Sequence, residues 1–315
     1  MTENTEKKDS KIKVVEYFDE RFYKIEKDDG SFDYYPSTTT ILGVTSKPYL
    51  AKWRGDIGNR EADVRINEAA ERGTRLHNAW KTYCQGGAVV FQDHRHPELT
   101  REEMDRIEGK YFGSMAILPT QDEMLQMRKL QTWRKILKPT PLITEQILYS
   151  VFNQRAGTAD NIFGIEAGKY YINGSKPLML EKGLYIADLK TGNAIDDDAF
   201  MQVADYFFML LEMSQSVEWV AKLFESFEPL VGALIIHTGA KTKNGIEGLS
   251  TILRTREELE QDYIDINHAA ELWKRKHKGI KPITLEIPTL IAMDLEQQEE
   301  TSNADDTGTS KAVGV

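Results

Sequence analysis

The sequence predicts an α/β fold with a central mixed β-sheet flanked by helices and a helical region toward the N-terminus. Three observations predict it: helical periodicity at the front, short apolar strands in the middle, and one strongly apolar helix among those strands. This order of elements is typical of a single α/β domain with a mixed sheet. The 315 residues suffice for one large domain with its own hydrophobic core, which we place at 12–293.

A disordered start over residues 1–11 is expected to precede a short β meander and a helical stretch. Asp28-Asp29-Gly30 is a turn signal within the meander. The helical stretch opens at 36–40, and a long helix is expected over 59–83, which contains no proline and one glycine. The strand-like segments of the meander are 13–17, 22–25 and 32–35.

A second helical region is expected at about 100–137, as a helical insertion in the domain at about 99–138. It starts with a capping box, in which the side chains of Thr100 and Glu103 bind each other's backbone N–H groups. Pro119 interrupts the region, because proline has no N–H group for the helical hydrogen bond.

The rest of the chain has a strand pattern around one apolar helix at 198–213. Two strands are expected to pair around Gln154-Arg155, and two more are joined at Asn173-Gly174. An amphipathic helix is expected at 256–277, and the polar, acidic residues 294–315 are expected to be disordered. The expected strands are 142–153, 156–165, 169–172, 184–189, 230–237 and 249–253.

Net charge and cysteine content exclude several classes of protein. The net charge of −10, from 40 basic and 50 acidic residues, argues against a protein that coats nucleic acid non-specifically. The single cysteine, Cys84, excludes an internal disulfide framework and an iron–sulfur cluster held by four cysteines. No apolar run approaches the roughly 20 residues of a membrane span, and the polar N-terminus is unlike a secretory signal. A cytoplasmic protein without membrane contact is therefore expected.

Two short segments are strongly basic in spite of the negative net charge. Residues 128–138 and residues 274–281 each hold five basic residues and no acidic one. They are interpreted either as the walls of a basic groove or as two solvated helix faces, and charge alone does not decide between these.

The strongest chemical feature is the segment Ile186-Ala187-Asp188-Leu189-Lys190-Thr191-Gly192. Side chains alternate along a strand, so Asp188 and Lys190 are expected on the same face, about 6.5 Å apart along the strand. Their apolar neighbours indicate a buried strand, where unpaired charges are costly. The pair is interpreted as part of a reactive site, and a structural ion pair at a strand end is the alternative.

A second acidic residue stands 28 positions earlier, in the segment Ala156-Gly157-Thr158-Ala159-Asp160. Gly157 permits close approach of another part of the chain. Asp160 lies near the end of a strand that can pair beside the strand of Asp188. Two carboxylates on adjacent strands with a lysine alongside are typical of a site for a hard divalent cation such as Mg²⁺. A turn aspartate is the alternative interpretation for Asp160 alone.

Two further groups of polar residues lie on expected helices. Arg72 and Arg75 surround a Gly-Thr step before His77, as a phosphate site needs, although a lone histidine on a helix is more often packed or exposed. Gln202 and Tyr206 are four residues apart on the apolar helix, so they share one face. They are interpreted as contacts into a site or as a core tyrosine with a polar neighbour.

In this order, the motifs GTRLH, GTAD, DLKTG and QVADY resemble the RecB-type branch of the PD-(D/E)XK nucleases. The front segment YPSTTTILG, together with KWRG and the long helix up to His77, is similar to the phage and mitochondrial genome maintenance exonucleases within that branch. The resemblance covers residues 35–206. Each motif alone is weak, but four in order on suitable elements are specific. The resemblance implies a restriction-endonuclease-like core.

Carried over to this sequence, the resemblance implies a site for Mg²⁺, with Mn²⁺ expected to substitute. Lys190 is implied as the catalytic lysine, its pKa lowered by nearby cations and burial. Gln202 and Tyr206 match the family's Gln-x-x-x-Tyr signature. Glu145 falls where some relatives place an extra acidic residue, and a strand-end salt bridge is an equal alternative for it. The implied metal ligands are the side chains of His77, Asp160 and Asp188 and the backbone carbonyl of Leu189.

The implied activity is that of a metal-dependent DNA exonuclease, which hydrolyses phosphodiester bonds in single strands or at DNA ends. Its expected setting is replication, recombination or repair, with a protein partner from these processes, in a bacterium or a phage-infected cell. A structure-specific flap endonuclease and a nuclease-fold DNA-binding protein without catalysis are the alternatives. The candidate DNA phosphate contacts are Ser37, Thr38, Thr39, Arg72 and Arg75.

Overall fold

A computed structural model describes the chain from Ile12 to Lys278, except 18–19, 28, 46, 93–99, 111–113, 141, 173–175, 228 and 240–247. The ends that are expected to be disordered, 1–11 and 294–315, lie outside the described residues. The chain divides into two units, Met1–Ile280 and Lys281–Val315, and all described residues belong to the first. A domain boundary at 293 stays a prediction.

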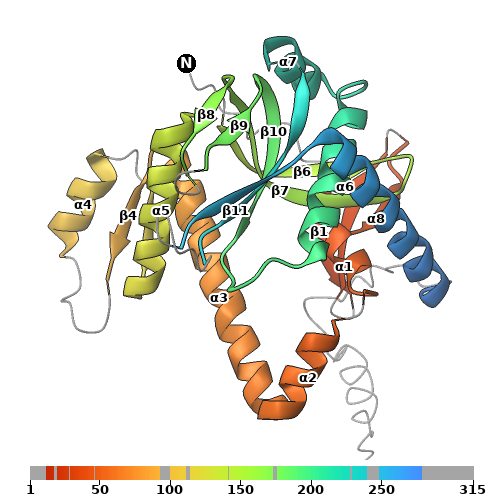
Figure 1. Ribbon diagram of the computed structural model, residues 1–315, viewed down its shortest axis with the longest axis horizontal. Coiled ribbons are helices and arrows are strands. Elements are labelled where there is room, and N and C mark those ends of the chain that lie inside the picture. The colour runs from red at the N-terminus through yellow and green to blue at the C-terminus, as the bar shows by residue number, and fades with distance from the viewer. Residues whose placement is uncertain are drawn as a thin grey trace, which may run out of the picture. The chain divides into compact units, whose positions relative to one another are not determined.

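A five-stranded sheet forms the centre of this unit, in the order β12-β11-β10-β7-β6 (Figure 1). β10 and β11 run parallel, and the other neighbours run antiparallel. The predicted α/β class with a central mixed sheet flanked by helices is therefore confirmed. The strands are β6 (Leu142–Ser150), β7 (Arg155–Ile165), β10 (Gly183–Lys190), β11 (Leu230–His237) and β12 (Ser250–Arg254).

Helices cover both faces of the sheet. Phe207 of α6 (Asp197–Met213) and Leu259 of α8 (Arg256–Lys276) belong to the core on one face, with α7 (Glu218–Phe227) beside them. Trp80 of α3 (Asn59–Cys84) and Trp133 of α5 (Gln121–Leu137) belong to the core on the other face. A strand covered on both sides has a nearly continuous apolar sequence, which is why β10 is buried up to Leu189.

A small antiparallel sheet, β1 (Ile12–Tyr17), β2 (Glu20–Glu26) and β3 (Phe32–Pro36), confirms the predicted meander. Phe22 packs with Trp273 of α8, at 6.1 Å between ring centroids. Tyr23 and Tyr35 pack around Ala156 at the start of β7. The short helix α1 (Thr38–Leu42) follows and lies against α8 through Ile41. The small sheet is thus attached beside the strand that carries Asp160.

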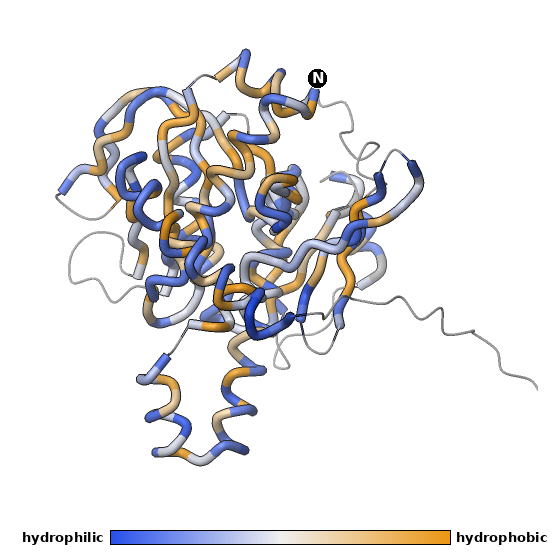
Figure 2. Tube along the Cα trace, turned by 90° about the vertical axis from the view of Figure 1, so that its right-hand side faces the viewer, coloured by the Kyte–Doolittle hydropathy of each residue, from blue (hydrophilic) through white to orange (hydrophobic). Residues whose placement is uncertain are grey.

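α2 (Pro48–Ile57) and α3 form a helical hairpin whose far end projects from the sheet (Figure 1). Gly58, between them, has a φ of 86°, which residues with a side chain rarely adopt. Hydrophilic and hydrophobic residues alternate along the projecting part without one continuous apolar face (Figure 2). α2 contains no buried residue, so its position depends on its ends.

The predicted helical insertion at 99–138 is wrong in one respect. It contains α4 (Arg101–Lys110) and α5, but a strand, β5 (Met115–Leu118), lies between them and pairs in parallel with β4 (Ala88–Phe91). Four apolar residues give no periodicity, and burial of Leu118 against α3 and α5 decides the outcome. The capping box at Thr100 is confirmed, because its hydroxyl accepts the N–H of Glu103.

A second correction concerns the strands before β10. β8 (Gly168–Tyr170) pairs with β9 (Leu178–Leu180), a strand that the sequence pattern did not predict, rather than with β10. The intervening turn at 173–175 lies outside the described residues. Within the described residues, none of the helices has the length and apolar character that crossing a bilayer requires.

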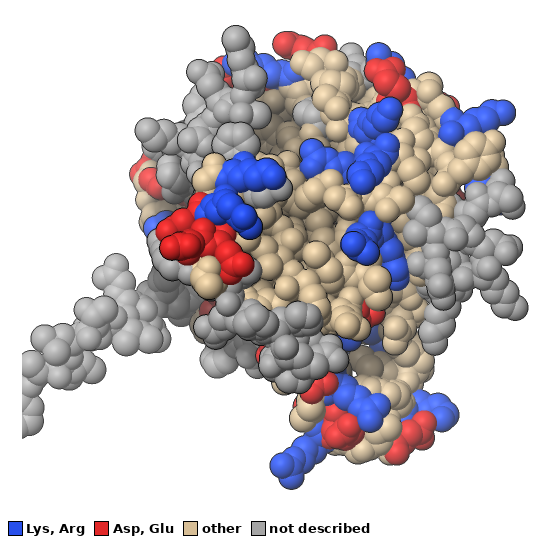
Figure 3. Space-filling model, turned by 90° about the vertical axis from the view of Figure 1, so that its left-hand side faces the viewer, with Lys and Arg blue, Asp and Glu red and all other residues tan. Residues whose placement is uncertain are grey.

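The basic run at 128–138 lies on α5 and its C-cap, and its side chains differ in their surroundings. Lys129 donates to the carbonyl of Thr238 at 3.0 Å, and Arg134 donates to the carbonyl of Tyr83 at 3.3 Å. Arg128, Lys135 and Lys138 are exposed. Basic side chains are spread over the face on which α4 and α5 lie (Figure 3). Part of the run therefore holds α5 in place, and a groove wall stays a prediction.

Candidate metal centre and its clefts

Three carboxylates stand in a row across neighbouring strands of the central sheet. The β6–β7 register is the same on both sides of Glu145, so Glu145 lies opposite Asp160. The last pair of the β7–β10 ladder is Asn161 with Ala187, so the next positions are Asp160 and Asp188. Antiparallel partners have their side chains on the same face. The sheet register thus brings three negative charges together.

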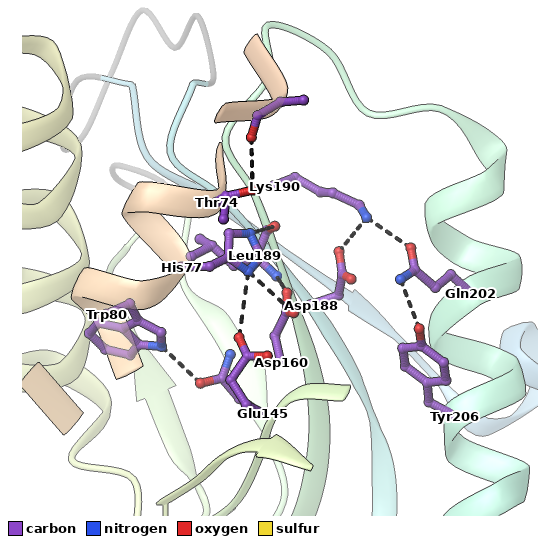
Figure 4. Close-up of polar contacts among 12 residues, drawn as sticks. Thr74, His77, Trp80, Glu145, Asp160, Asp188, Leu189, Lys190, Gln202 and Tyr206 are labelled. Carbon is purple, nitrogen blue, oxygen red and sulfur yellow. Dashed lines mark hydrogen bonds and ion pairs between the residues drawn. The ribbon is translucent and has the colours of Figure 1, made fainter. Parts of the chain in front are cut away.

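His77 reaches this row from α3 (Figure 4). Its Nδ1 lies 3.3 Å from Asp160 Oδ1 and 4.0 Å from Glu145 Oε1, and its Nε2 lies 3.1 Å from the carbonyl oxygen of Leu189. Gly73, one turn before His77, lies beside Thr191, because a Cβ there would make ordinary contact with the Thr191 hydroxyl at 3.4 Å. One atom each of His77, Glu145 and Asp160 lie within 4.8 Å of one another, a grouping that could hold a metal ion.

The charges of the cluster shift the pKa values of its members. Burial lowers the pKa of His77, but the carboxylates of Asp160, Asp188 and Glu145 outweigh it and raise the value to about 9. Both ring nitrogens face oxygen acceptors, which fits a protonated imidazole. Burial raises the pKa of Asp160, but His77 and the N–H of Leu189, 2.7 Å from Oδ2, lower it below its ordinary value.

The pKa values of the other two carboxyl groups, Asp188 and Glu145, are shifted upward. Burial, opposed by Lys190 and helped by Asp160, raises the pKa of Asp188 to about 6. Burial and Asp160 also raise the pKa of Glu145. Like charges at short distance disfavour full ionisation. The row therefore carries more negative charge than its two basic neighbours, His77 and Lys190, neutralise.

Lys190 lies at the end of a chain of polar contacts toward α6 (Figure 4). Its Nζ lies 2.8 Å from Asp188 Oδ2, which confirms the predicted common face, and 2.9 Å from Gln202 Oε1. Gln202 Nε2 in turn donates to the hydroxyl of Tyr206 at 3.1 Å. Gly157 makes room for this tyrosine, because a Cβ there would overlap the ring of Tyr206. The sequence pattern placed these residues in one site, and the structure brings them together.

The pKa of Lys190 in the metal-free protein is shifted by burial and by its carboxylate neighbours. Burial lowers it, as expected, but the carboxylate of Asp188 outweighs burial and raises the pKa above its ordinary value. Lys190 is therefore a cation in the metal-free protein. The expected lowering includes the effect of bound metal ions and stays a prediction.

Two cavities meet at this cluster. The broad cleft, of about 770 Å³, extends past Lys47, Leu50 and Asp196, and the polar pocket, of about 420 Å³, extends past Arg21 and Asn78. The residues that line both cavities are Thr39, Ala70, Gly73, His77, Asp160 and Gln202. The candidate metal ligands are thus accessible from two sides.

The three candidate phosphate contacts near α1 differ in accessibility. Ser37 is 2% exposed, and its side chain accepts the N–H of Thr40 as the helix cap. Thr38 is fully buried and donates to Asp205 Oδ2 at 2.7 Å, which leaves no surface for a phosphate. Thr39 is exposed and lines both cavities. Ser37 and Thr39 both line the polar pocket, and Thr39, which is exposed, is the more accessible of the two to a ligand.

The two arginines before His77 lie away from the carboxylate row. Arg75 Nε binds the buried carboxylate of Glu123 at 2.7 Å, which joins α3 to α5. Arg72 is half-buried, and its Nε has no hydrogen-bond partner within the described residues. Neither is among the described residues that line the two cavities. Their expected role as phosphate contacts has no support from these positions.

Two supporting features of the site, a backbone conformation and an ion pair, could not be predicted from local patterns. Glu145 has a φ of 56° within a strand, a left-handed conformation that is uncommon outside glycine and concentrates at functional sites. Lys47, which precedes α2, lies 3.0 Å from Asp196 and 2.6 Å from Asp198 at the start of α6. Such a contact joins residues some 150 positions apart, so no sequence spacing signals it.

Comparison with known proteins gives no family. Neither a scan against protein-family models nor a search of the curated proteins finds a match for this chain. What the site can do is therefore argued from its own geometry.

Proposed function

We propose that this protein is a metal-dependent deoxyribonuclease, an exonuclease that hydrolyses phosphodiester bonds in single-stranded DNA or at DNA ends. The observation that supports it most is the row of Glu145, Asp160 and Asp188 with His77 above it and Lys190 beside it. These residues line clefts that open to solvent. The proposal includes a PD-(D/E)XK core of the RecB type and a setting in DNA replication, recombination or repair.

The donor set suits a hard divalent cation with some tolerance for nitrogen. Carboxylates and a backbone carbonyl are ligands for Mg²⁺, and one imidazole makes Mn²⁺ acceptable as well. Asp188 Oδ2 is buried, and no hydrogen bond of good geometry reaches it within the described residues, although Lys190 forms an ion pair with it. His77, Asp160, Asp188 and the carbonyl of Leu189 would hold the ion, with Glu145 as a further ligand.

A bound ion would supply an activated water and charge relief at the scissile phosphate. The side chains of this protein would do the rest. Lys190 would place a positive charge beside the phosphate, where charge develops in the transition state. Gln202 accepts a hydrogen bond from Lys190 and donates one to Tyr206, so these two residues fix the direction of the lysine side chain.

Cleavage of end-labelled DNA tests the proposal. Linear and circular single strands and duplexes would be incubated with Mg²⁺ or with excess EDTA. We expect cleavage of linear single strands or of DNA ends with Mg²⁺, none in EDTA, and no cleavage by Asp160→Asn. Asp56→Asn, at an exposed ion pair on α2, is the matched control.

Four results would contradict the proposal or part of it. Full activity in EDTA would exclude the metal mechanism. An active Asp160→Asn variant would exclude the proposed ligand set. Cleavage of circular DNA as fast as linear DNA would favour an endonuclease, and cleavage confined to branched substrates would favour the flap-specific alternative.

A further inference from the structure

The polar pocket beside the metal centre has a wall of its own chemistry. It lies between β2 of the small sheet and α3, and its volume of about 420 Å³ is at the lower end of the range that small ligands occupy. Hydroxyl, amide and guanidinium groups dominate its lining. Among them are Arg21, Tyr23, Thr39, Thr74, Asn78 and Thr158.

A short chain of contacts places this wall next to the carboxylate row. Thr158 and Asp160 are two residues apart on β7, so their side chains share a face and lie about 6.5 Å apart along the strand. The hydroxyl of Tyr23 lies 2.9 Å from Thr158 Oγ1. Arg21 is two residues before Tyr23 on β2 and lines the same pocket. The pocket therefore has candidate metal ligands at one side, among them His77, Glu145 and Asp160, and this polar wall next to them.

Arg21 and Asn78 are the two groups of this wall that are left to bind a ligand. The Arg21 side chain is exposed, and no carboxylate within the described residues forms an ion pair with it, unlike Arg54, Arg65 and Arg254. Asn78 is exposed on α3, next to His77, and its amide has no hydrogen bond to the residues that the structure describes.

The structural role of Arg21 is carried by its backbone. Its N–H donates to Thr40 Oγ1 at 3.0 Å, and its carbonyl accepts from the hydroxyl of Thr40 and from the N–H of Ser37. The guanidinium lines the pocket beside Tyr23 and lowers the pKa of that residue, against the larger effect of burial. Shortening the side chain therefore leaves the attachment of α1 to β2 in place.

We propose that the polar pocket is a subsite for one nucleotide, in which Arg21 binds the phosphate that adjoins the scissile bond and Asn78 hydrogen-bonds the same nucleotide. The inference rests on the proposed function and adds the residues that hold the strand beside the site. A phosphate next to three carboxylates needs a cation, and an unpaired arginine offers several donors to its oxygens. The pocket is too small for a duplex, so the strand enters it as a single strand.

Binding and cleavage by the full chain test this subsite. Affinity for a fluorescent oligothymidylate would be measured in EDTA over a salt series, and KM for its cleavage in Mg²⁺. We expect Arg21→Ala to weaken binding and raise KM about tenfold or more, and to lower the slope of log affinity against log salt by about one. Arg21→Lys should keep the salt slope. Lys13→Ala, an exposed lysine on the neighbouring strand β1, is the matched control and should change neither value.

The phosphate bound by Arg21 can be a terminal phosphate or an internal phosphodiester, and the end of the substrate distinguishes them. KM for oligonucleotides with and without a terminal phosphate would be measured with the wild-type protein and with Arg21→Ala. Loss of discrimination between them in Arg21→Ala would identify a terminal phosphate, and an equal rise of KM for both would identify an internal phosphodiester. Either result supports the subsite.

The subsite and the nuclease proposal fail in different ways. Wild-type cleavage with unchanged affinity, KM and salt slope in Arg21→Ala would overturn the subsite and leave the nuclease. Arg21-dependent binding without any cleavage would overturn the nuclease and leave the subsite. No binding of the oligonucleotide by the wild-type protein would overturn the subsite.

Discussion

Two buried aspartates of this protein are held in opposite ways. Asp205 on α6 accepts from Arg155 Nη2 at 2.7 Å and from Thr38 at 2.7 Å, and Arg155 also donates to Asn267. One negative charge thus meets one positive charge, and both carboxylate oxygens of Asp205 have a partner. Asp188 is 2% exposed and thus nearly as buried, but it belongs to a row of three carboxylates with two basic neighbours, and it lines the broad cleft.

The difference shows which property distinguishes a candidate site. Burial of a charged residue does not distinguish it, because Asp205 is the more deeply buried of the two aspartates. A surplus of like charge does, because it is costly to the fold unless a ligand neutralises it. Burial is the main cause that raises the pKa of Asp188 to about 6, and the like charge of Asp160 adds to it while Lys190 opposes it. We therefore expect substitutions in the two clusters to have opposite effects on stability and on catalysis.

The largest expected effect is on stability, in the network around Asp205. Arg155→Met should lower the free energy of unfolding by about 3–5 kcal/mol, because Asp205 then stays buried without its partner. Asp188→Asn, measured in EDTA at pH 7, should leave the free energy of unfolding unchanged or higher, since a disfavoured charge is removed. Urea titration of both variants measures this. An equal loss in both would mean that Asp188 and Lys190 are only a structural ion pair.

The next effect is on catalysis. Lys190→Ala should slow DNA cleavage at least ~100-fold, the scale for loss of a positioned charged group, with little change in DNA affinity. Raised Mn²⁺ should not restore it, because the metal ligands remain. Single-turnover rates and binding measurements test this, with Lys52→Ala on α2 as the control. A folded Lys190→Ala protein that cleaves at the wild-type rate would remove the lysine from the mechanism.

Metal affinity should depend on pH in a direction set by His77. Its pKa of about 9 in the metal-free protein means that an incoming cation displaces a proton, so Mn²⁺ binding should strengthen as pH rises from 6 to 9. The stability of the metal-free protein should change with pH in the opposite direction. The protonated histidine stabilises the fold fully below about pH 6.5, and this contribution to the free energy of unfolding is lost as pH rises through 9. Calorimetry in buffers of different ionisation enthalpy would detect the released proton. Binding of Mn²⁺ without proton release would exclude His77 as a ligand.

The smallest effect is expected from the basic end of α8. Neutralising Lys274, Arg275 and Lys276 should weaken DNA binding a few-fold at low salt if this segment lies along the DNA. Deleting the acidic residues 294–315 should leave cleavage intact or strengthen binding, because those residues repel phosphates. Lys27→Ala, at an exposed ion pair with Asp33, is the control. Unchanged binding would mean a solvated helix face.

How far the sequence predicts this molecule depends on the distance between interacting residues. The strand of Asp188 and the apolar helix of Gln202 and Tyr206 are predictable, since local alternation and helical spacing determine which side chains share a face. The place of Glu145 is not, because it depends on the register between β6 and β7 and on a left-handed backbone. The burial of Thr38 is likewise set by Asp205, 167 residues further along the chain.

The candidate ligands come from α3, β6, β7 and β10, elements whose side chains also build the core. A cation that joins one helix to three strands would bind the folded chain and not the unfolded one. At a hundred times its dissociation constant it would add about 2.7 kcal/mol to the free energy of unfolding. The melting temperature of this protein would then report the concentration of free metal, in a measurement that needs no substrate.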